Sequence, residues 1–214
     1  MEIAGYIAVV VVGYLLGSIP TGFLVGKAKG IDIRSVGSGN IGATNALRVL
    51  GKPAGIFVLL MDALKGWLAA YVVAKLLCRA SGFPSDSDTE IVFKILAALG
   101  AVLGHNYTCW LQFKGGKGIA TSAGVLAALV PAALLIILSV FIVLFLITRI
   151  VSVGSIAASA TLPPATWFTT GNLTLTLVTS AMGALAIYKH RANIERLLKG
   201  TESRMNFKKK EVAP

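Results

Sequence analysis

Three short segments of this chain combine glycines, small polar side chains and cations, which is the composition of a site that binds phosphate. The first segment runs from residue 37 to residue 48 and reads GSGNIGATNALR. Glycines let backbone N–H groups approach a ligand closely, and such amides at the start of a helix bind anions. The closing arginine can donate two hydrogen bonds to one phosphate. We therefore predict phosphate contacts from Gly37, Ser38, Gly39, Asn40, Thr44, Asn45 and Arg48.

The glycine spacing of this first segment also fits the G-x-G-x-x-G pattern of dinucleotide sites. That pattern indicates a dinucleotide only between a strand and a helix, and no strand-like run precedes residue 37. No lysine follows the glycines, as a Walker A loop would require. The alternative that stays open is a flexible loop of turn residues between two helices.

The second segment places two glycines between two lysines, just before a long uncharged run. It consists of Lys114, Gly115, Gly116 and Lys117. Cations next to backbone amides again suit a phosphate. The alternative is an ordinary basic loop with a glycine turn.

The third segment runs from residue 190 to residue 202 and reads HRANIERLLKGTE. His190 and Asn193 are three residues apart, so they share one face of a helix. Arg196 and Glu202 follow as further binding candidates. A basic helix that binds anionic lipid headgroups is the alternative, although such a helix has no need of His190 and Asn193.

Three ionisable residues lie within apolar runs, where such residues are rare and usually functional. Asp62 and Lys65 are three positions apart, and His105 precedes the second segment. We expect these residues to support the site. The alternatives are an ion pair that neutralises itself and a buried histidine whose hydrogen bonds are satisfied.

The rest of the chain is too apolar for a soluble domain. Its 214 residues are 14% charged with a mean hydropathy of +0.80, and the net charge is +11. Soluble domains carry about 25% charged residues. A nucleic-acid partner would need a basic face on a soluble surface, whereas here hydrophobic runs separate the charges. We therefore expect an all-α bundle of transmembrane helices and no nucleic-acid partner.

The uncharged runs predict about seven transmembrane helices in a single domain, residues 1–214. The run 150–188 would form a helix about 58 Å long, nearly twice the hydrocarbon thickness, so it must reverse, near Gly171. The run 118–148 is divided at Pro131 because both of its basic flanks then lie on one side. The predicted spans are residues 3–26, 54–78, 91–113, 118–129, 131–148, 151–169 and 172–188.

The charges of the loops predict how the chain is oriented, because cytoplasmic loops are rich in Lys and Arg. The loop 27–52 and the tail 189–214 are basic, whereas the loop 79–90 is acidic. We expect the N-terminus outside and the C-terminus in the cytoplasm. All three polar segments then face the cytoplasm.

Taken together, the polar segments resemble the PlsY family of bacterial membrane acyltransferases, which use acyl phosphate. The resemblance covers nearly the whole chain in order. One departure is Thr108, where the family commonly has a proline three residues after the histidine. The resemblance rests on Gly37–Arg48, Asp62 with Lys65-Gly66, Gly104-His105 with Lys114–Thr121, and His190 with Asn193–Glu202.

The resemblance implies a reaction and its setting. An acyl phosphate gives its acyl group to the 1-hydroxyl of glycerol 3-phosphate, forming lysophosphatidic acid and inorganic phosphate, in the first acylation of phospholipid biosynthesis. The enzyme would lie in the bacterial inner (plasma) membrane among its lipids, with its site at the cytoplasmic face. The resemblance implies no cofactor, no metal and no acyl-CoA or acyl carrier protein donor. It suggests a functional link to the enzyme that makes acyl phosphate.

The expected mechanism is direct transfer without an acyl-enzyme. The His-x-x-x-x-Asp element of other glycerolipid acyltransferases is missing after both His105 and His190, and phosphate is a good leaving group. Either His190 or a substrate phosphate would take the hydroxyl proton. The expected catalytic residues are Ser38, Arg48, Lys117, His190 and Asn193.

Two other classes of membrane protein remain as alternatives. A transporter of organic phosphates would place polar residues near the membrane midplane between repeats. Here most polar residues lie at one end of the predicted spans, and no repeat is evident. A phosphotransferase acting on CDP-alcohols would need several aspartates for a metal, whereas the predicted spans contain only Asp62.

Overall fold

The computed structural model describes residues 2–84 and 88–205, and the regular structure within them is entirely helical. This confirms the predicted all-α class. Asp86, which belongs to the acidic loop, and residues 206–214 of the predicted basic tail lie outside the described residues.

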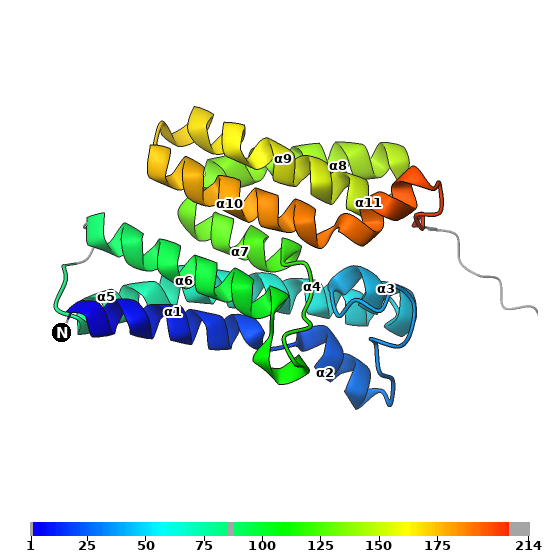
Figure 1. The fold of residues 1–214 in the computed structure, drawn as a ribbon, viewed down its shortest axis with the longest axis horizontal. Helices are drawn as coiled ribbons and strands as arrows, with labels where there is room; N and C mark the ends of the chain where they lie inside the picture. The colour runs from blue at the N-terminus through cyan, green and yellow to red at the C-terminus, as the bar shows by residue number, and fades with distance from the viewer. Residues whose placement is uncertain (1, 85–87, 206–214) are drawn as a thin grey trace, which may run out of the picture. The chain divides into compact units, whose positions relative to one another are not determined.

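The described chain forms two compact units, the first ending at Leu134 and the second beginning at Leu135, within α8. The helices of the first unit are α1 (Glu2–Ser18), α2 (Thr21–Ala28), α3 (Ala43–Leu50), α4 (Lys52–Trp67), the π-helix η1 (Leu68–Val73), α5 (Ala74–Ala80), α6 (Asp88–Asn106), the 3-10 turn η2 (Cys109–Leu111) and α7 (Ile119–Leu129). The second unit holds most of α8 (Pro131–Thr148), then α9 (Val151–Thr170), α10 (Leu173–Lys189) and α11 (Arg191–Leu198), as labelled in Figure 1.

Four helical stretches among residues 2–84 and 88–205 are long and apolar enough to cross a membrane. They are Ile3–Ala28, Lys52–Ala80, Asp88–Leu111 and Pro131–Thr148. α7 is about 16 Å long, roughly half the hydrocarbon thickness. The number of spans and the orientation of the termini therefore stay predictions.

The first apolar stretch is broken into two helices at Pro20. Proline has no N–H to donate to the carbonyl four residues earlier, which here is that of Leu16. The N–H of Ile19 donates to that carbonyl instead, at 3.3 Å. α1 therefore ends at Ser18, and α2 begins at Thr21.

Because of the break, two backbone carbonyls lie outside the regular hydrogen-bond pattern of a helix. Side chains from other parts of the first unit donate hydrogen bonds to them. The Thr108 hydroxyl donates to the carbonyl of Ser18 at 2.6 Å, and the Lys65 ammonium donates to that of Ile19 at 2.8 Å. Buried backbone oxygens require such partners, above all in an apolar environment. The break thereby joins α1 and α2 to α4 and to the turn that follows α6.

α1 and α6 approach each other closely because glycines face each other across their contact. A Cβ atom at Gly17 would overlap the carbonyl oxygen of Ala101, and one at Gly104 would overlap that of Tyr14. Small residues spaced four apart are typical of close helix pairs in membranes. Figure 1 shows these helices side by side in the first unit.

In the second unit, α9 and α10 form an antiparallel pair (Figure 1). α9 continues through Pro163 and Pro164 to Thr170, and the chain reverses at Gly171, whose φ is 60°. The side chain of Asn172 then caps α10 by accepting the N–H of Leu175 at 3.0 Å. The reversal that the length of this uncharged run requires lies here.

We predict that Gly17→Val lowers the free energy of unfolding by about 1–3 kcal/mol, the usual range for overpacking a tight contact. Thermal unfolding in detergent measures this change. Ala4→Val is the matched control, because Ala4 lies on the same helix but is exposed. Equal melting temperatures for the two variants would contradict the close contact between α1 and α6.

Candidate functional site

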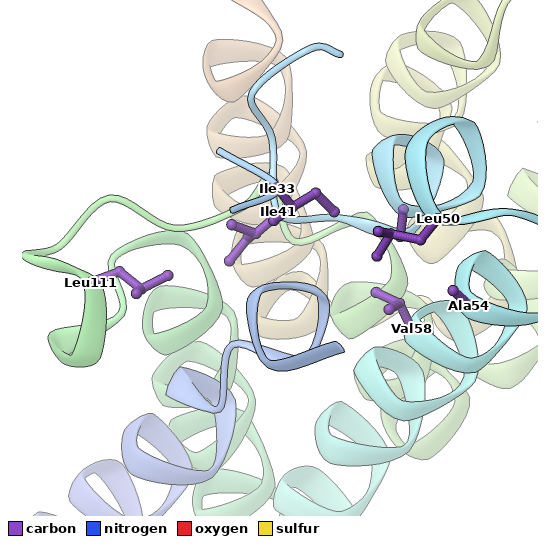
Figure 2. Close-up of a cluster of buried hydrophobic side chains, with 7 residues drawn as sticks. Ile33, Ile41, Leu50, Ala54, Val58 and Leu111 are labelled. Atoms are coloured by element: carbon purple, nitrogen blue, oxygen red, sulfur yellow. The ribbon is translucent and has the colours of Figure 1, made fainter. Parts of the chain in front are cut away.

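The first polar segment is anchored by buried apolar side chains. Ile33 precedes it and Ile41 lies within it, with exposed fractions of 0% and 3%. Both belong to an apolar cluster with Leu50 and Val58 from α3 and α4 (Figure 2). The structure therefore favours a fixed loop over a flexible connection between helices.

Asn45 holds this loop from the inside, where it is 1% exposed. Its Oδ1 atom accepts the N–H of Ser38 at 2.9 Å, and its Nδ2 atom donates to the carbonyls of Ile33 and Val36, both at 3.1 Å. A Cβ atom at Gly37, where φ is 62°, would overlap Oδ1. Both ends of the Asn45 amide are thus engaged in the loop, and the expected phosphate contact from Asn45 stays a prediction.

The outer side of the loop presents the groups that can reach a ligand. Ser38 and Gly39 are exposed, and the Asn40 side chain accepts the N–H of Gly42 at 2.9 Å just before α3 begins. Thr44 and Arg48 are four residues apart on α3, so they share a face. This side of the loop thus carries exposed backbone, hydroxyls and the Arg48 side chain.

Arg34, the other arginine of this region, is engaged by Asp32 at 2.7 Å. Hydrogen bonds from the Arg34 side chain, and then from its backbone N–H, lower the pKa of Asp32 to about 2. Residues 33–48 contain no acidic residue. Arg48, which closes the first segment, stays the arginine that we predict to contact a phosphate.

The glycines of the second segment pack against the end of α6. The N–H groups of Gly115 and Gly116 donate to the carbonyls of Asn106 and His105, at 3.3 and 3.0 Å. A Cβ atom at Gly116 would overlap the His105 ring. These two amides therefore pack the loop onto α6, and the phosphate contacts expected from Gly115 and Gly116 stay predictions.

The two lysines of this segment flank the packed glycines. Lys114 is exposed and Lys117 is half-buried, directly before Gly118, which caps α7 with a φ of 78°. The start of a helix favours an anion through its unpaired N–H groups and its dipole. We therefore predict that this segment binds phosphate through its lysines and the first turn of α7.

The turn that leads into the second segment joins the same apolar cluster as the first. Leu111 of η2 is 6% exposed and packs in the cluster with Ile33 and Ile41 (Figure 2). Gln112 and Phe113 then adopt left-handed backbone angles, with φ of 53° and 61°, which are uncommon outside glycine. The two segments are thus gathered in one unit by shared packing.

Thr108 fits this turn in place of the family's proline. Its φ is −65°, the value to which a proline ring fixes the backbone. Its hydroxyl also makes the bond to Ser18 that a proline could not make. The φ of Thr108 is therefore one that a proline could also adopt, and the threonine hydroxyl adds a hydrogen bond.

The three ionisable residues of the apolar runs form one buried network in the first unit. Their exposed fractions are 2% for Asp62, 5% for Lys65 and 4% for His105. One oxygen of Asp62 lies 2.8 Å from the Lys65 ammonium and 3.7 Å from Nδ1 of His105, and it accepts the Thr21 hydroxyl at 3.2 Å. The Asp62–Lys65 pair therefore does more than neutralise its own charges. Through its contacts with Thr21 and His105 it connects α2, α4 and α6.

His190 lies between α10 and α11 in the second unit and is 3% exposed. Its Nδ1 atom is 2.7 Å from the carbonyl oxygen of Ala186. A carbonyl only accepts, so we assign the ring proton to Nδ1, which makes Nε2 the acceptor in the neutral imidazole. That nitrogen can accept a hydrogen bond from a hydroxyl.

Glu202 gathers the remaining predicted residues of the second unit. It accepts hydrogen bonds from Asn193 and Arg196, both at 2.6 Å, and from Ser152 of α9 at 2.8 Å. Burial raises the pKa of Glu202, but these three hydrogen bonds outweigh it and lower the pKa. The carboxylate holds the segment after α11 to α9, and binding of a substrate by Glu202 stays a prediction.

Arg196 takes part in the same contact, because its Nε atom donates to Glu202. Ser152 was not among the predicted site residues. A serine in an apolar run is the only signal in the sequence, and such serines often bond their own helix backbone. Its partner could be found only from the structure.

Two crystal structures have folds similar to this chain, with TM-scores of 0.83 and 0.80. Both are of PlsY (YgiH), described as an integral membrane glycerol 3-phosphate acyltransferase, in its glycerol 3-phosphate form and its lysophosphatidic acid form. The identities are 40% and 39%, over 94% of this chain and 96% and 95% of those chains. The fold is that of an integral membrane acyltransferase.

The sequence comparisons define the family. A family model described as glycerol-3-phosphate acyltransferase matches residues 7–200. A relative of that name from Fusobacterium nucleatum is 42% identical, covering 92% of this chain and 97% of the relative. Another, from Desulforudis audaxviator, is 44% identical, covering 98% of this chain and all of the relative. The chain belongs to the glycerol-3-phosphate acyltransferase family and thus to phospholipid biosynthesis.

We predict that Glu202→Gln lowers stability at neutral pH by about 1–3 kcal/mol, because Arg196 loses its charged partner. The pKa of Glu202 is lowered from an ordinary value of 4.5, so its stabilisation is present above that value and is lost as the pH falls further. Thermal unfolding should therefore separate the wild type from the variant at neutral pH and bring them together under acid.

Glu195→Gln is the matched control for this prediction, because Glu195 pairs with Lys199 at 2.6 Å but both are exposed. Exposed pairs contribute at most about 1 kcal/mol. A Glu202→Gln variant that is no less stable than this control would contradict the positioning role of Glu202.

Proposed function

We propose that this protein transfers an acyl group from an acyl phosphate to the 1-hydroxyl of glycerol 3-phosphate, forming lysophosphatidic acid and inorganic phosphate. Membership of the acyltransferase family supports the reaction class. The two similar crystal structures are of a glycerol 3-phosphate form and a lysophosphatidic acid form. Acyl phosphate as donor is supported by the chemistry of the loops.

The observation that carries the proposal is the gathering of two basic, glycine-containing loops by one apolar cluster in the first unit. They present Arg48, Lys114 and Lys117, and neither residues 33–48 nor residues 112–121 include a carboxylate. Cations beside backbone amides and hydroxyls suit phosphate dianions. A donor and an acceptor that each carry a phosphate would use both loops.

The proposed step is direct transfer. The hydroxyl oxygen attacks the acyl carbonyl carbon and forms the ester bond. The bond between that carbon and the phosphate oxygen breaks, and the phosphate leaves with the electron pair. Arg48 and Lys117 stabilise the charge that develops on the departing phosphate and the carbonyl oxygen. The groups proposed to hold a phosphate are Ser38, Gly39, Asn40 and Thr44.

His190 is proposed to bind the acceptor hydroxyl. Nε2 of His190 accepts its hydrogen bond and then its proton, as a general base. Asn193 lies within one helical turn, where Glu202 fixes its side chain, and it helps to orient the acceptor. The alternative recipient of the proton is a substrate phosphate.

The proposed location is the inner membrane of a bacterium, with the loops at the cytoplasmic face. The excess of Lys and Arg in the loop 27–52 and in the tail supports this orientation. An enzyme that makes acyl phosphate is the functional partner that this donor would require.

The donor is tested with purified protein and glycerol 3-phosphate, supplied in turn with acyl phosphate, acyl-CoA and an acyl carrier protein thioester. We expect lysophosphatidic acid from acyl phosphate alone, with one inorganic phosphate released per product. Equal or faster product formation from acyl-CoA would contradict the proposal. Arg48→Ala should reduce kcat/KM by about 10²-fold, whereas Arg34→Ala, on the same loop but paired with Asp32, should change it little.

For His190→Ala we predict a loss of more than about 10²-fold in kcat at nearly unchanged KM for glycerol 3-phosphate, as expected when a general base is removed. Steady-state kinetics over a range of glycerol 3-phosphate concentrations measures both parameters. A raised KM with near-normal turnover would instead leave the proton to a substrate phosphate.

A further inference from the structure

We propose that His105 positions the glycine loop, residues 114–118, and that the buried Asp62–Lys65 pair fixes the His105 ring in place. The inference rests on the proposed function, because it concerns how Lys117 is held for a phosphate. It assigns a purpose to ionisable groups that take no part in the proposed chemical step.

His105 contacts the glycine loop through both its backbone and its ring. Its carbonyl accepts the N–H of Gly116 at 3.0 Å. A Cβ atom at Gly116 would overlap Nε2 of the ring, which is 4% exposed. The loop therefore packs directly against the imidazole ring. Only a glycine can come this close, because it has no Cβ atom.

The opposite nitrogen of the same ring faces the buried ion pair. Nδ1 lies 3.7 Å from the Asp62 oxygen that also contacts Lys65 at 2.8 Å. Lys65 is itself held by the Ile19 carbonyl, and Asp62 by the Thr21 hydroxyl. The carboxylate thus has a fixed direction, set by the break between α1 and α2.

The helix that carries the ion pair also contacts the helix that follows the glycine loop. A Cβ atom at Gly66, next to Lys65, would overlap the carbonyl oxygen of Thr121 in the first turns of α7. A Cβ atom at Gly124 would likewise overlap that of Ala63. The glycine loop is therefore held from α6 at its start and from α4 at its end.

Packing alone does not require this arrangement. A buried ion pair is costly to desolvate, and apolar residues of similar volume are often as stabilising or more so. What such residues would lose is the directed contact with His105 and the bond to the Ile19 carbonyl. Since a misplacement of about 1 Å can reduce catalysis about 10²-fold, a fixed loop benefits the reaction.

The test replaces both partners at once, as Asp62→Leu with Lys65→Met, so that no unpaired charge is left buried. The matched control is Glu90→Leu with Lys94→Met, since this pair at the start of α6 is also close, at 2.7 Å, with Glu90 2% exposed. Both double variants are compared by thermal unfolding, by kinetics with acyl phosphate and glycerol 3-phosphate, and by the rate of trypsin cleavage after Lys114 and Lys117.

We expect the Glu90 and Lys94 variant to unfold near the wild-type temperature, and the Asp62 and Lys65 variant to unfold at a somewhat lower temperature, because the Ile19 carbonyl loses its side-chain donor. The Asp62 and Lys65 variant should lose about 10²-fold in kcat/KM and be cut faster at the glycine loop, while the Glu90 and Lys94 variant changes neither. Unchanged cleavage and kinetics in the first variant, or equal changes in both, would overturn the proposal.

His105→Ala is the second variant, which keeps the test decisive if the double variant does not fold. It should expose the glycine loop to trypsin and lower kcat/KM, and adding Gly116→Ala should not restore either. Restoration by the second change would mean that His105 only fills space. A wild type without activity on these substrates would contradict the proposed function, whereas the cleavage rates would still test the positioning of the loop.

Discussion

The backbone oxygens of Ser18 and Ile19 leave the helical hydrogen-bond pattern where Pro20 interrupts the first apolar stretch. Inside an apolar unit such oxygens need donors, and Thr108 and Lys65 supply them at 2.6 and 2.8 Å. These bonds fix the turn after α6 and the ion pair of α4 relative to the break. The glycine contact between α1 and α6 holds the helices close enough for both bonds to form.

The two polar loops of the first unit depend on these hydrogen bonds and on the contact between α1 and α6. Their glycines and buried amides are satisfied within the protein, by Asn45 in one loop and by the end of α6 in the other. Exposed hydroxyls, backbone and cations are what remains for a ligand. The second unit follows the same rule, because Glu202 gathers Asn193, Arg196 and Ser152 while the His190 ring is oriented by a carbonyl. Each unit thus uses buried polar contacts to fix some of its predicted site residues.

The helical class and the polar segments could be predicted from the sequence. The hydrocarbon core of a membrane excludes charged residues, which are therefore concentrated in short segments between the apolar runs. The sequence could not show the direction of a buried group. Asn45 and the amides of Gly115 and Gly116 have the right chemistry for phosphate, yet tertiary contacts turn them inward. The break at Pro20 was also missed, although its cause is local. The partner of Ser152 was missed because Glu202 lies far away in the sequence.

We propose that Arg48 and Lys117, together with a good leaving group, make a covalent enzyme intermediate unnecessary. Intact-protein mass spectrometry tests this most directly, after the purified protein is mixed with acyl phosphate in the absence of glycerol 3-phosphate. Direct transfer predicts an unchanged protein mass, with lysophosphatidic acid forming only when the acceptor is added. A protein heavier by one acyl group, which disappears when glycerol 3-phosphate is added, would contradict the account.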